Sequence, residues 1–123
     1  MIALDHTHVP SRDMDAAARQ FAYILGLEYG GPSDWYAGVR VNETFAVMFV
    51  NYMEPTEVHH YAFRVDDADF DAILARVKDA GIPFRSDPEG EMDHETNTFN
   101  DGRGFYWEDP DGHLMEVLTR AAI

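Results

Sequence analysis

Two histidines and one glutamate have the residue types and the sequence context for a divalent metal site. His6 and His60 each lie in a stretch of alternating polarity that predicts a strand. Glu116 shares one face of a third predicted strand with Leu114 and Leu118, where a carboxylate is costly unless a cation or an Arg or Lys compensates its charge. Two imidazoles and one carboxylate would leave open positions on an octahedral ion, which suits catalysis by Fe(II), Mn(II), Ni(II) or Zn(II).

The elements that must position these residues occur twice in the chain. Each copy has a strand with a histidine, then an aspartate that can cap a helix, then an amphipathic helical pattern and a glycine that can end the helix. These residues are His6, Asp13 and Gly26 in the first copy, and His60, Asp67 and Gly81 in the second. Equivalent strands of a symmetric fold can bring the two histidines close together.

Shorter strands follow each predicted helix. We expect them at residues 27–29, 35–41 and 45–52 in the first copy, and at 83–85, 104–108 and 113–120 in the second. The order is therefore β-α-β-β-β, repeated, which predicts an α+β fold. The length fits a single domain over residues 1–123, with a first module at about 1–53 and a second at about 57–123. The long polar segment 86–103 is typical of a functional or mobile loop.

Composition excludes several classes of partner and of chemistry. Lys and Arg number 9 against 23 Asp and Glu, a net charge of −14 that disfavours nucleic acid and membrane surfaces. The absence of cysteine excludes disulfides, thiolate metal ligands and a cysteine nucleophile. No segment approaches the roughly 18 apolar residues of a membrane span, and the first residues lack the pattern of a secretory signal. We therefore expect a cytoplasmic protein.

Three segments carry a resemblance to a known family. They are Leu4-Asp5-His6, then His60-Tyr61-Ala62-Phe63, and finally Asp109-Pro110-Asp111-Gly112-His113-Leu114-Met115-Glu116. In these segments the chain resembles the superfamily of glyoxalases, bleomycin-resistance proteins and extradiol dioxygenases, also called vicinal oxygen chelate proteins. The resemblance implies two βαβββ modules that form a cupped mixed sheet with helices on the outer face, in a homodimer. It also implies that His6, His60 and Glu116 are the ligands of one divalent metal.

Three branches of the superfamily place further residues beside the metal. Glyoxalase I has a fourth ligand on the last strand of the first module, where alignment places Phe49, which has no metal-binding atom. The fosfomycin-modifying transferases have a Thr two residues after the first metal histidine, where this chain has His8. The extradiol dioxygenases have a Tyr that corresponds to Tyr106, and an acid–base His upstream of it, for which His94 is the candidate. The resemblance therefore implies that Tyr106 donates to a metal-bound oxygen and that His94 moves a proton, and His8, on the same strand face as His6, is a second candidate for the proton transfer.

Three other residues are candidates for substrate binding. Arg103 can bind a substrate carboxylate, or it can pair with one of the many acids. Asn97 lies between His94 and Tyr106 in the sequence. Phe49 belongs to a set of aromatic residues that either line a cup for a planar ligand or form ordinary core.

Two functions fit this sequence. The first is a metal-dependent enzyme that binds a small substrate through two oxygens and stabilises an anionic intermediate, as a dioxygenase, a lyase or a thiol transferase would. The second is a metal-free protein of the bleomycin-resistance type that sequesters a drug in a dimer groove, since an acidic surface and many aromatics suit a cationic aromatic drug. The complete set of His6, His60 and Glu116 favours the enzyme, because a pure binder does not require it.

Overall fold

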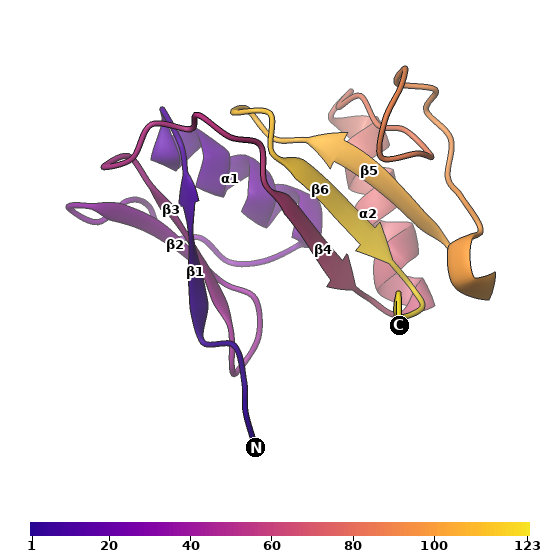
Figure 1. Ribbon diagram of the computed structural model, residues 1–123, viewed down its shortest axis with the longest axis horizontal. Helices are drawn as coiled ribbons and strands as arrows, with labels where there is room; N and C mark the ends of the chain where they lie inside the picture. The colour runs from indigo at the N-terminus through magenta and orange to yellow at the C-terminus, as the bar shows by residue number, and fades with distance from the viewer. The chain divides into compact units, whose positions relative to one another are not determined.

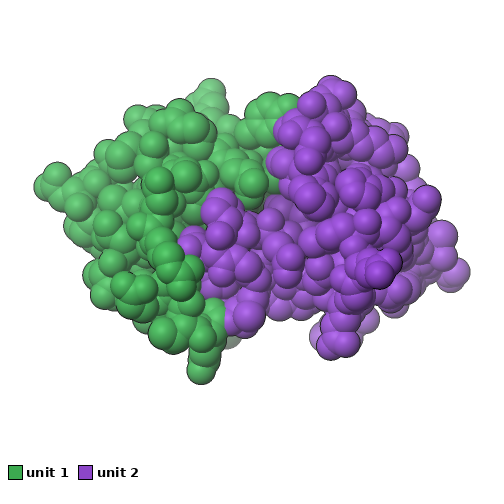
Figure 2. All heavy atoms as spheres, turned by 90° about the horizontal axis from the view of Figure 1, so that it is seen from above, with its two compact units in different colours: residues 1–57 green, residues 58–123 purple.

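The computed structural model describes all 123 residues and divides them into two compact units. Unit 1 comprises Met1–Glu57 and unit 2 comprises Val58–Ile123 (Figure 2). The boundary lies where the second copy of the sequence pattern begins.

Unit 1 is a three-stranded sheet with one helix packed on it (Figure 1). Its elements are β1 (His6–Pro10), α1 (Met14–Leu25), β2 (Tyr36–Arg40) and β3 (Ala46–Val50). The strand order is β1-β3-β2, with β1 parallel and β2 antiparallel to β3. Asp13 caps α1 by accepting a hydrogen bond from the backbone N–H of Ala16. Gly26 ends the helix at φ 70°, a conformation that favours glycine.

Unit 2 repeats this arrangement. Its elements are β4 (His60–Arg64), α2 (Asp67–Asp79), the 3₁₀ helix η1 (Phe99–Asp101), β5 (Gly104–Glu108) and β6 (Leu114–Leu118). The strand order is β4-β6-β5, with β4 parallel and β5 antiparallel to β6. The side chain of Asp66 caps α2 by accepting from the backbone N–H of Asp69, so the cap lies one residue before the expected Asp67.

One face of each sheet packs on its helix and forms the core. In unit 1, Val47 and Phe49 are buried, and the Phe49 ring packs edge-on against Phe21 of α1 with centroids 5.5 Å apart. In unit 2, Phe105 packs in the same way against Phe70 of α2 at 5.6 Å. Because side chains alternate along a strand, the residues between these core positions point to the other face. That second face carries the candidate metal ligands.

The predicted α+β fold and its repeated element order are confirmed. Two short segments differ from the expected regular strands. Residues 27–29 make no ladder, and 83–85 contributes a single bridge between Arg85 and Tyr106. Segments of three residues have room for only one or two ladder hydrogen bonds, so they pair irregularly. No helix is long and apolar enough to cross a membrane.

Candidate metal centre

His60 and Glu116 meet on the face of the unit 2 sheet opposite α2. They lie on the parallel neighbours β4 and β6, where His60 is opposite Leu114 and Ala62 is opposite Glu116. Nε2 of His60 is 3.0 Å from Oε1 of Glu116, and the glutamate is only 8% exposed. Two ligand atoms in cis positions at about 2.1 Å from one ion are themselves about 3 Å apart. The pair therefore has the spacing that a divalent ion requires of two neighbouring ligands.

Tyr106 joins this pair from β5. It lies opposite Glu116 in the antiparallel β5–β6 pair, and its ring centroid is 6.1 Å from that of His60. Burial, together with the negative charge of Glu116 and a hydrogen bond to it, raises the pKa of Tyr106 to about 12. The phenol therefore stays protonated at neutral pH and can donate a hydrogen bond.

His6 and His8 lie on one face of β1 in unit 1, with ring centroids 5.4 Å apart. Nδ1 of His6 is 2.7 Å from a carboxylate oxygen of Asp5, and Nδ1 of His8 is 2.7 Å from the hydroxyl of Tyr52. Histidines that ligate metals usually donate their other ring N–H to an oxygen in this way. Sequence reasoning missed both partners. Asp5 was visible as the neighbour of His6, whereas Tyr52 is 44 residues from His8.

The repeat shows which residue of unit 1 corresponds to Glu116. Glu116 is the third residue of β6 and lies opposite Ala62, while the third residue of β3 is Met48, opposite His8. The alignment that placed Phe49 at this position was wrong by one residue, because Phe49 faces α1. A thioether suits soft metals rather than hard divalent ions such as Mn(II). The corrected position therefore also lacks an oxygen ligand.

The predicted ligand set is divided between the two units. Unit 1 contains His6, and unit 2 contains His60 and Glu116. Nowhere in the structure do three His, Asp or Glu side chains gather closely enough to hold a metal ion. The structure brings His60 and Glu116 together, and the role of His6 as a third ligand stays a prediction.

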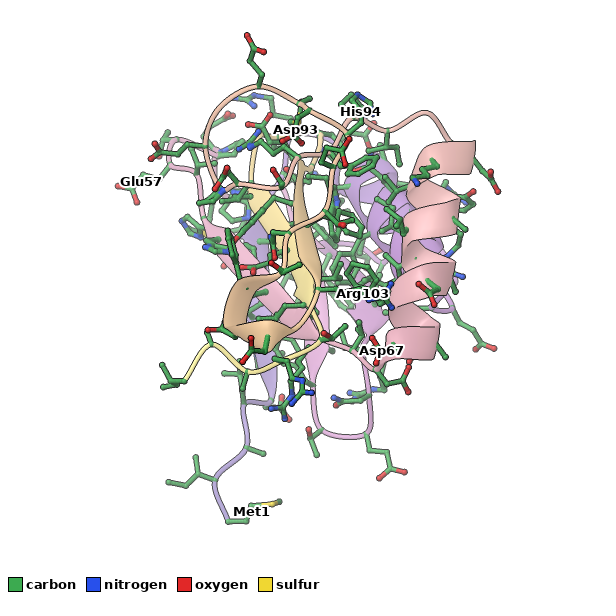
Figure 3. The ribbon with its side chains drawn as sticks, turned by 90° about the vertical axis from the view of Figure 1, so that its right-hand side faces the viewer. Met1, Glu57, Asp67, Asp93, His94 and Arg103 are labelled. Atoms are coloured by element: carbon green, nitrogen blue, oxygen red, sulfur yellow. The ribbon has the colours of Figure 1, made fainter.

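Arg103, a predicted substrate contact, is engaged by α2 (Figure 3). Its guanidinium binds carboxylate oxygens of Asp67 and Asp71 at 3.1 and 2.8 Å, and lies 4.4 Å from the ring centroid of Phe70. These acids, above all the hydrogen bond to Asp71, raise the pKa of Arg103. The arrangement matches the second alternative drawn from the sequence, pairing with nearby acids, and it fastens α2 to the start of β5.

His94 and Asn97 hold the long loop in place. The backbone N–H of His94 donates to the carbonyl of Phe84 at 2.9 Å, and its ring packs edge-on against the Phe84 ring at 5.1 Å. Phe84 in turn packs on Phe105, which points toward α2 and away from the face of Glu116. Asn97 donates to the carbonyl of Ser86 at 2.8 Å. Both residues therefore organise the loop around the helix-facing core.

A pocket of about 350 Å³ opens beside His60 in unit 2. Arg85 and Glu108 line it, and the two side chains are 3.8 Å apart. The Arg85 side chain is 9% exposed and donates to the carbonyls of Asp87 and Pro88 at 3.0 and 2.7 Å. This buried cation therefore anchors the loop that forms one wall of the pocket. Sequence reasoning missed Arg85, because nothing around it distinguishes it from a surface arginine.

Two α/β repeats with the same strand order, a histidine opening each first strand and a glutamate on the last strand, define the vicinal oxygen chelate class. Residues 3–117 match the Glyoxalase/Bleomycin resistance protein/Dioxygenase superfamily. The chain therefore belongs to this superfamily.

The chain is similar to proteins named for fosfomycin resistance. It is 34% identical to Glutathione transferase FosA of Serratia marcescens, over 94% of this chain and 79% of that protein. It is also 34% identical to Fosfomycin resistance protein FosX of Mesorhizobium japonicum, over 60% of this chain and 48% of that protein. The chain thus spans about half the length of the FosX relative.

Two solved structures resemble the whole chain. Oxidase ChaP-H2 has a TM-score of 0.89 and 37% identity, and the match covers 98% of this chain and 94% of that chain. Oxidase ChaP-H1 has a TM-score of 0.86 and 40% identity, and covers 98% of both chains. The relatives' names show that the superfamily contains transferases and oxidases, and they leave the reaction of this chain to be proposed.

Proposed function

We propose that this protein is a divalent-metal-dependent enzyme in which His6, His60 and Glu116 hold one metal ion. Its substrate is a small molecule that binds through two oxygens, and its reaction passes through an anionic intermediate. The metal, as a Lewis acid, supplies the charge that stabilises this anion.

The environment of Glu116 is the observation that carries the proposal. The carboxylate is 8% exposed, it contacts His60 and Tyr106, and no Arg or Lys pairs with it. A buried carboxylate that has only an imidazole and a phenol as partners, with no Arg or Lys beside it, would be stabilised by a further positive charge. Of the two ways to compensate such a charge, pairing with Arg or Lys is not used. This favours a bound cation, held by the same imidazole that faces the carboxylate.

The protein residues around this site have separate tasks. Two nitrogens and one carboxylate oxygen suit Fe(II), Mn(II), Ni(II) or Zn(II) and leave positions open for substrate. Tyr106, protonated and next to Glu116, is the proposed acid–base residue in unit 2. It takes this role in place of His94, whose ring packs on Phe84 at the other side of the sheet. Neither Arg103 nor Asn97 is assigned a contact with the substrate.

The pocket beside His60 is the proposed place for the body of the substrate. Its volume of about 350 Å³ lies at the lower end of the range for ligand pockets, roughly 300–1,000 Å³, which fits a small molecule. Two similar structures that cover nearly the whole chain are named oxidases, which favours a dioxygenase-like reaction over a lyase or a thiol transfer. We also propose a homodimer, as the resemblance implies.

A metal-free drug-binding protein is the second candidate function. Trp35 and Tyr52 are 48% and 59% exposed in unit 1, and both rings lie edge-on against His8, at 5.6 and 5.8 Å. Exposed, mutually packed aromatic rings suit a planar ligand that stacks. This function makes no use of Glu116.

Elemental analysis of untagged protein, purified without chelator, separates the two functions. The enzyme predicts about one equivalent of Fe, Mn, Ni or Zn in the wild type, and loss of that metal in Glu116→Ala. The matched control is Glu108→Ala, which removes a carboxylate from the same sheet without touching the proposed ligands. Wild-type protein that takes up no metal from any of the four salts would reject the enzyme in favour of the binding protein.

A further inference from the structure

We propose that His8 is a further ligand of the metal, so that unit 1 contributes two imidazoles, His6 and His8, rather than one. The inference rests on the proposed metal site and extends it. It assigns His8 to metal binding instead of proton transfer. Three observations within unit 1 support it.

The first observation is the geometry of the two rings. His6 and His8 are two residues apart on β1, so their side chains share one face of the sheet. Their centroids are 5.4 Å apart and the ring planes are tilted by 35°. Two imidazoles bound to one ion through nitrogens at about 2.1 Å have centroids no more than about 6.4 Å apart. The observed separation allows both rings to reach the same ion.

The second observation is the orientation of both imidazoles. Each Nδ1 is 2.7 Å from an oxygen, that of Asp5 for His6 and that of Tyr52 for His8. When Nδ1 donates to an oxygen, the neutral ring keeps its lone pair on Nε2, which is then the metal-binding atom. Neither Nε2 has a hydrogen-bond partner in the structure. Trp35 packs edge-on against the His8 ring at 5.6 Å and restricts its rotation.

The third observation is that the residue able to bind a metal lies on different strands at matching positions of the two units. In unit 2 the small Ala62 lies opposite the ligand Glu116. At the same place in unit 1 the potential ligand His8 lies opposite the non-ligand Met48. Strands that pair are about 4.8 Å apart, so a longer side chain on β1 reaches the space above the neighbouring residue of β3. At this position the proposed ligand therefore lies on the first strand in unit 1 and on the third strand in unit 2.

Long-range ¹H–¹⁵N correlation spectra of histidine rings test the inference residue by residue. The full chain is labelled with ¹⁵N-histidine, and spectra are recorded without metal and with one equivalent of Zn(II). We expect Zn(II) to shift Nε2 of three histidines, His6, His8 and His60, to the metal-bound region. The signals of His8 are identified by their absence in His8→Gln.

The outcomes separate this inference from the proposed function. If only His6 and His60 shift, His8 is not a ligand and the three-residue site stands. If no histidine shifts, both the inference and the metal site are overturned. The shifts are measured on the wild type, and the His8→Gln variant serves only to assign the His8 signals.

Zn(II) affinity, measured by competition with a fluorescent chelator, gives a second readout. His8→Gln should weaken binding by about 10–100-fold, as expected for a group that fixes a metal. The matched control is His94→Gln, since the His94 ring packs on Phe84 at the helix-facing side of unit 2, and the Zn(II) affinity of this variant should change less than about twofold. Equal affinities of the wild type and His8→Gln would overturn the inference.

Discussion

Unit 1 and unit 2 have the same topology and register but different chemistry at matching positions. Unit 2 places Tyr106 and Glu116 opposite each other on its second and third sheet strands, and unit 1 places Gly38 and Met48 there. Both units keep a histidine at the start of the first strand. The repeat therefore fixes where a side chain points, while each copy has acquired its own set of functional groups. At these matching positions only unit 2 has a carboxylate and a phenol.

A second contrast lies in the turn before the last strand of each unit. In unit 1, Oδ1 of the exposed Asn42 accepts backbone hydrogen bonds from Thr44 and Phe45 at 2.9 and 3.0 Å. In unit 2, Oδ1 of Asp109 accepts two such bonds, both at 2.9 Å, but Asp109 is 8% exposed and its Oδ2 is buried without a partner. The same turn is thus built with a neutral side chain in one unit and with a buried acid in the other.

The largest effect should come from the same replacement at matching positions of the two sheets. Glu116→Leu removes a proposed ligand and should lower divalent metal affinity by about 100-fold or more, whereas Met48→Leu replaces a side chain without a hard donor and should change it less than about twofold. Chelator competition measures both. An equal loss of metal affinity in the two variants would contradict the proposal that Glu116 is a ligand and Met48 is not.

Asp109→Asn should give the next largest effect, on stability. Burial raises the pKa of Asp109, so the folded protein keeps the proton of this group to a higher pH than the unfolded chain does. The stability from this group is present below the unfolded pKa, near 4, and is lost as pH rises through the folded pKa. The variant, which carries no charge at any pH, should therefore lose less stability than the wild type as the pH rises from about 4 toward neutral.

Urea unfolding across that pH range measures the difference. The matched control is Asn42→Asp, which places a charge in the exposed turn of unit 1 and should shift stability by less than about 0.5 kcal/mol. A wild type and an Asp109→Asn variant with the same pH dependence would contradict the buried charge.

The smallest effect concerns the arginine that pairs with acidic residues of each helix, Arg19 for α1 and Arg103 for α2. Arg103→Met should lower the free energy of unfolding by about 1 kcal/mol, because it loses two carboxylates of α2 and the face of Phe70. Arg19→Met should cost about 0.5 kcal/mol, because Arg19 pairs at 3.1 Å with Asp15 of its own helix on the solvent side and lies farther from its aromatic ring, 5.4 Å from the centroid of Tyr29. Urea unfolding ranks the two variants. A loss of metal affinity in Arg103→Met would contradict its purely structural role.

Much of the fold could be predicted from the sequence, because the spacing of His, Asp and Gly repeats and each element has strong local signals. The alignment error that placed Phe49 where the structure has Met48 shows the limit of prediction from the sequence. A one-residue error in strand register moves a side chain to the opposite face, and both residues are apolar, so composition does not reveal it. The pairing of His8 with Tyr52 and the burial of Arg85 depend on contacts between distant segments, which periodicity cannot supply. His60 and Glu116 were predicted together only through the family resemblance.

The sequence separation of 56 residues from His60 to Glu116 has a consequence for folding. The β5–β6 hairpin can close locally, whereas β4 must join β6 across α2 and the long loop, which is entropically costly. We therefore expect the two side chains to meet late, when little of unit 2 remains unfolded. A cation that needs both side chains would bind only the folded state. At a free concentration of a hundred times its Kd, such a cation would add about 2.7 kcal/mol to the free energy of unfolding. Metal supply would then set how long the folded chain survives, apart from any turnover.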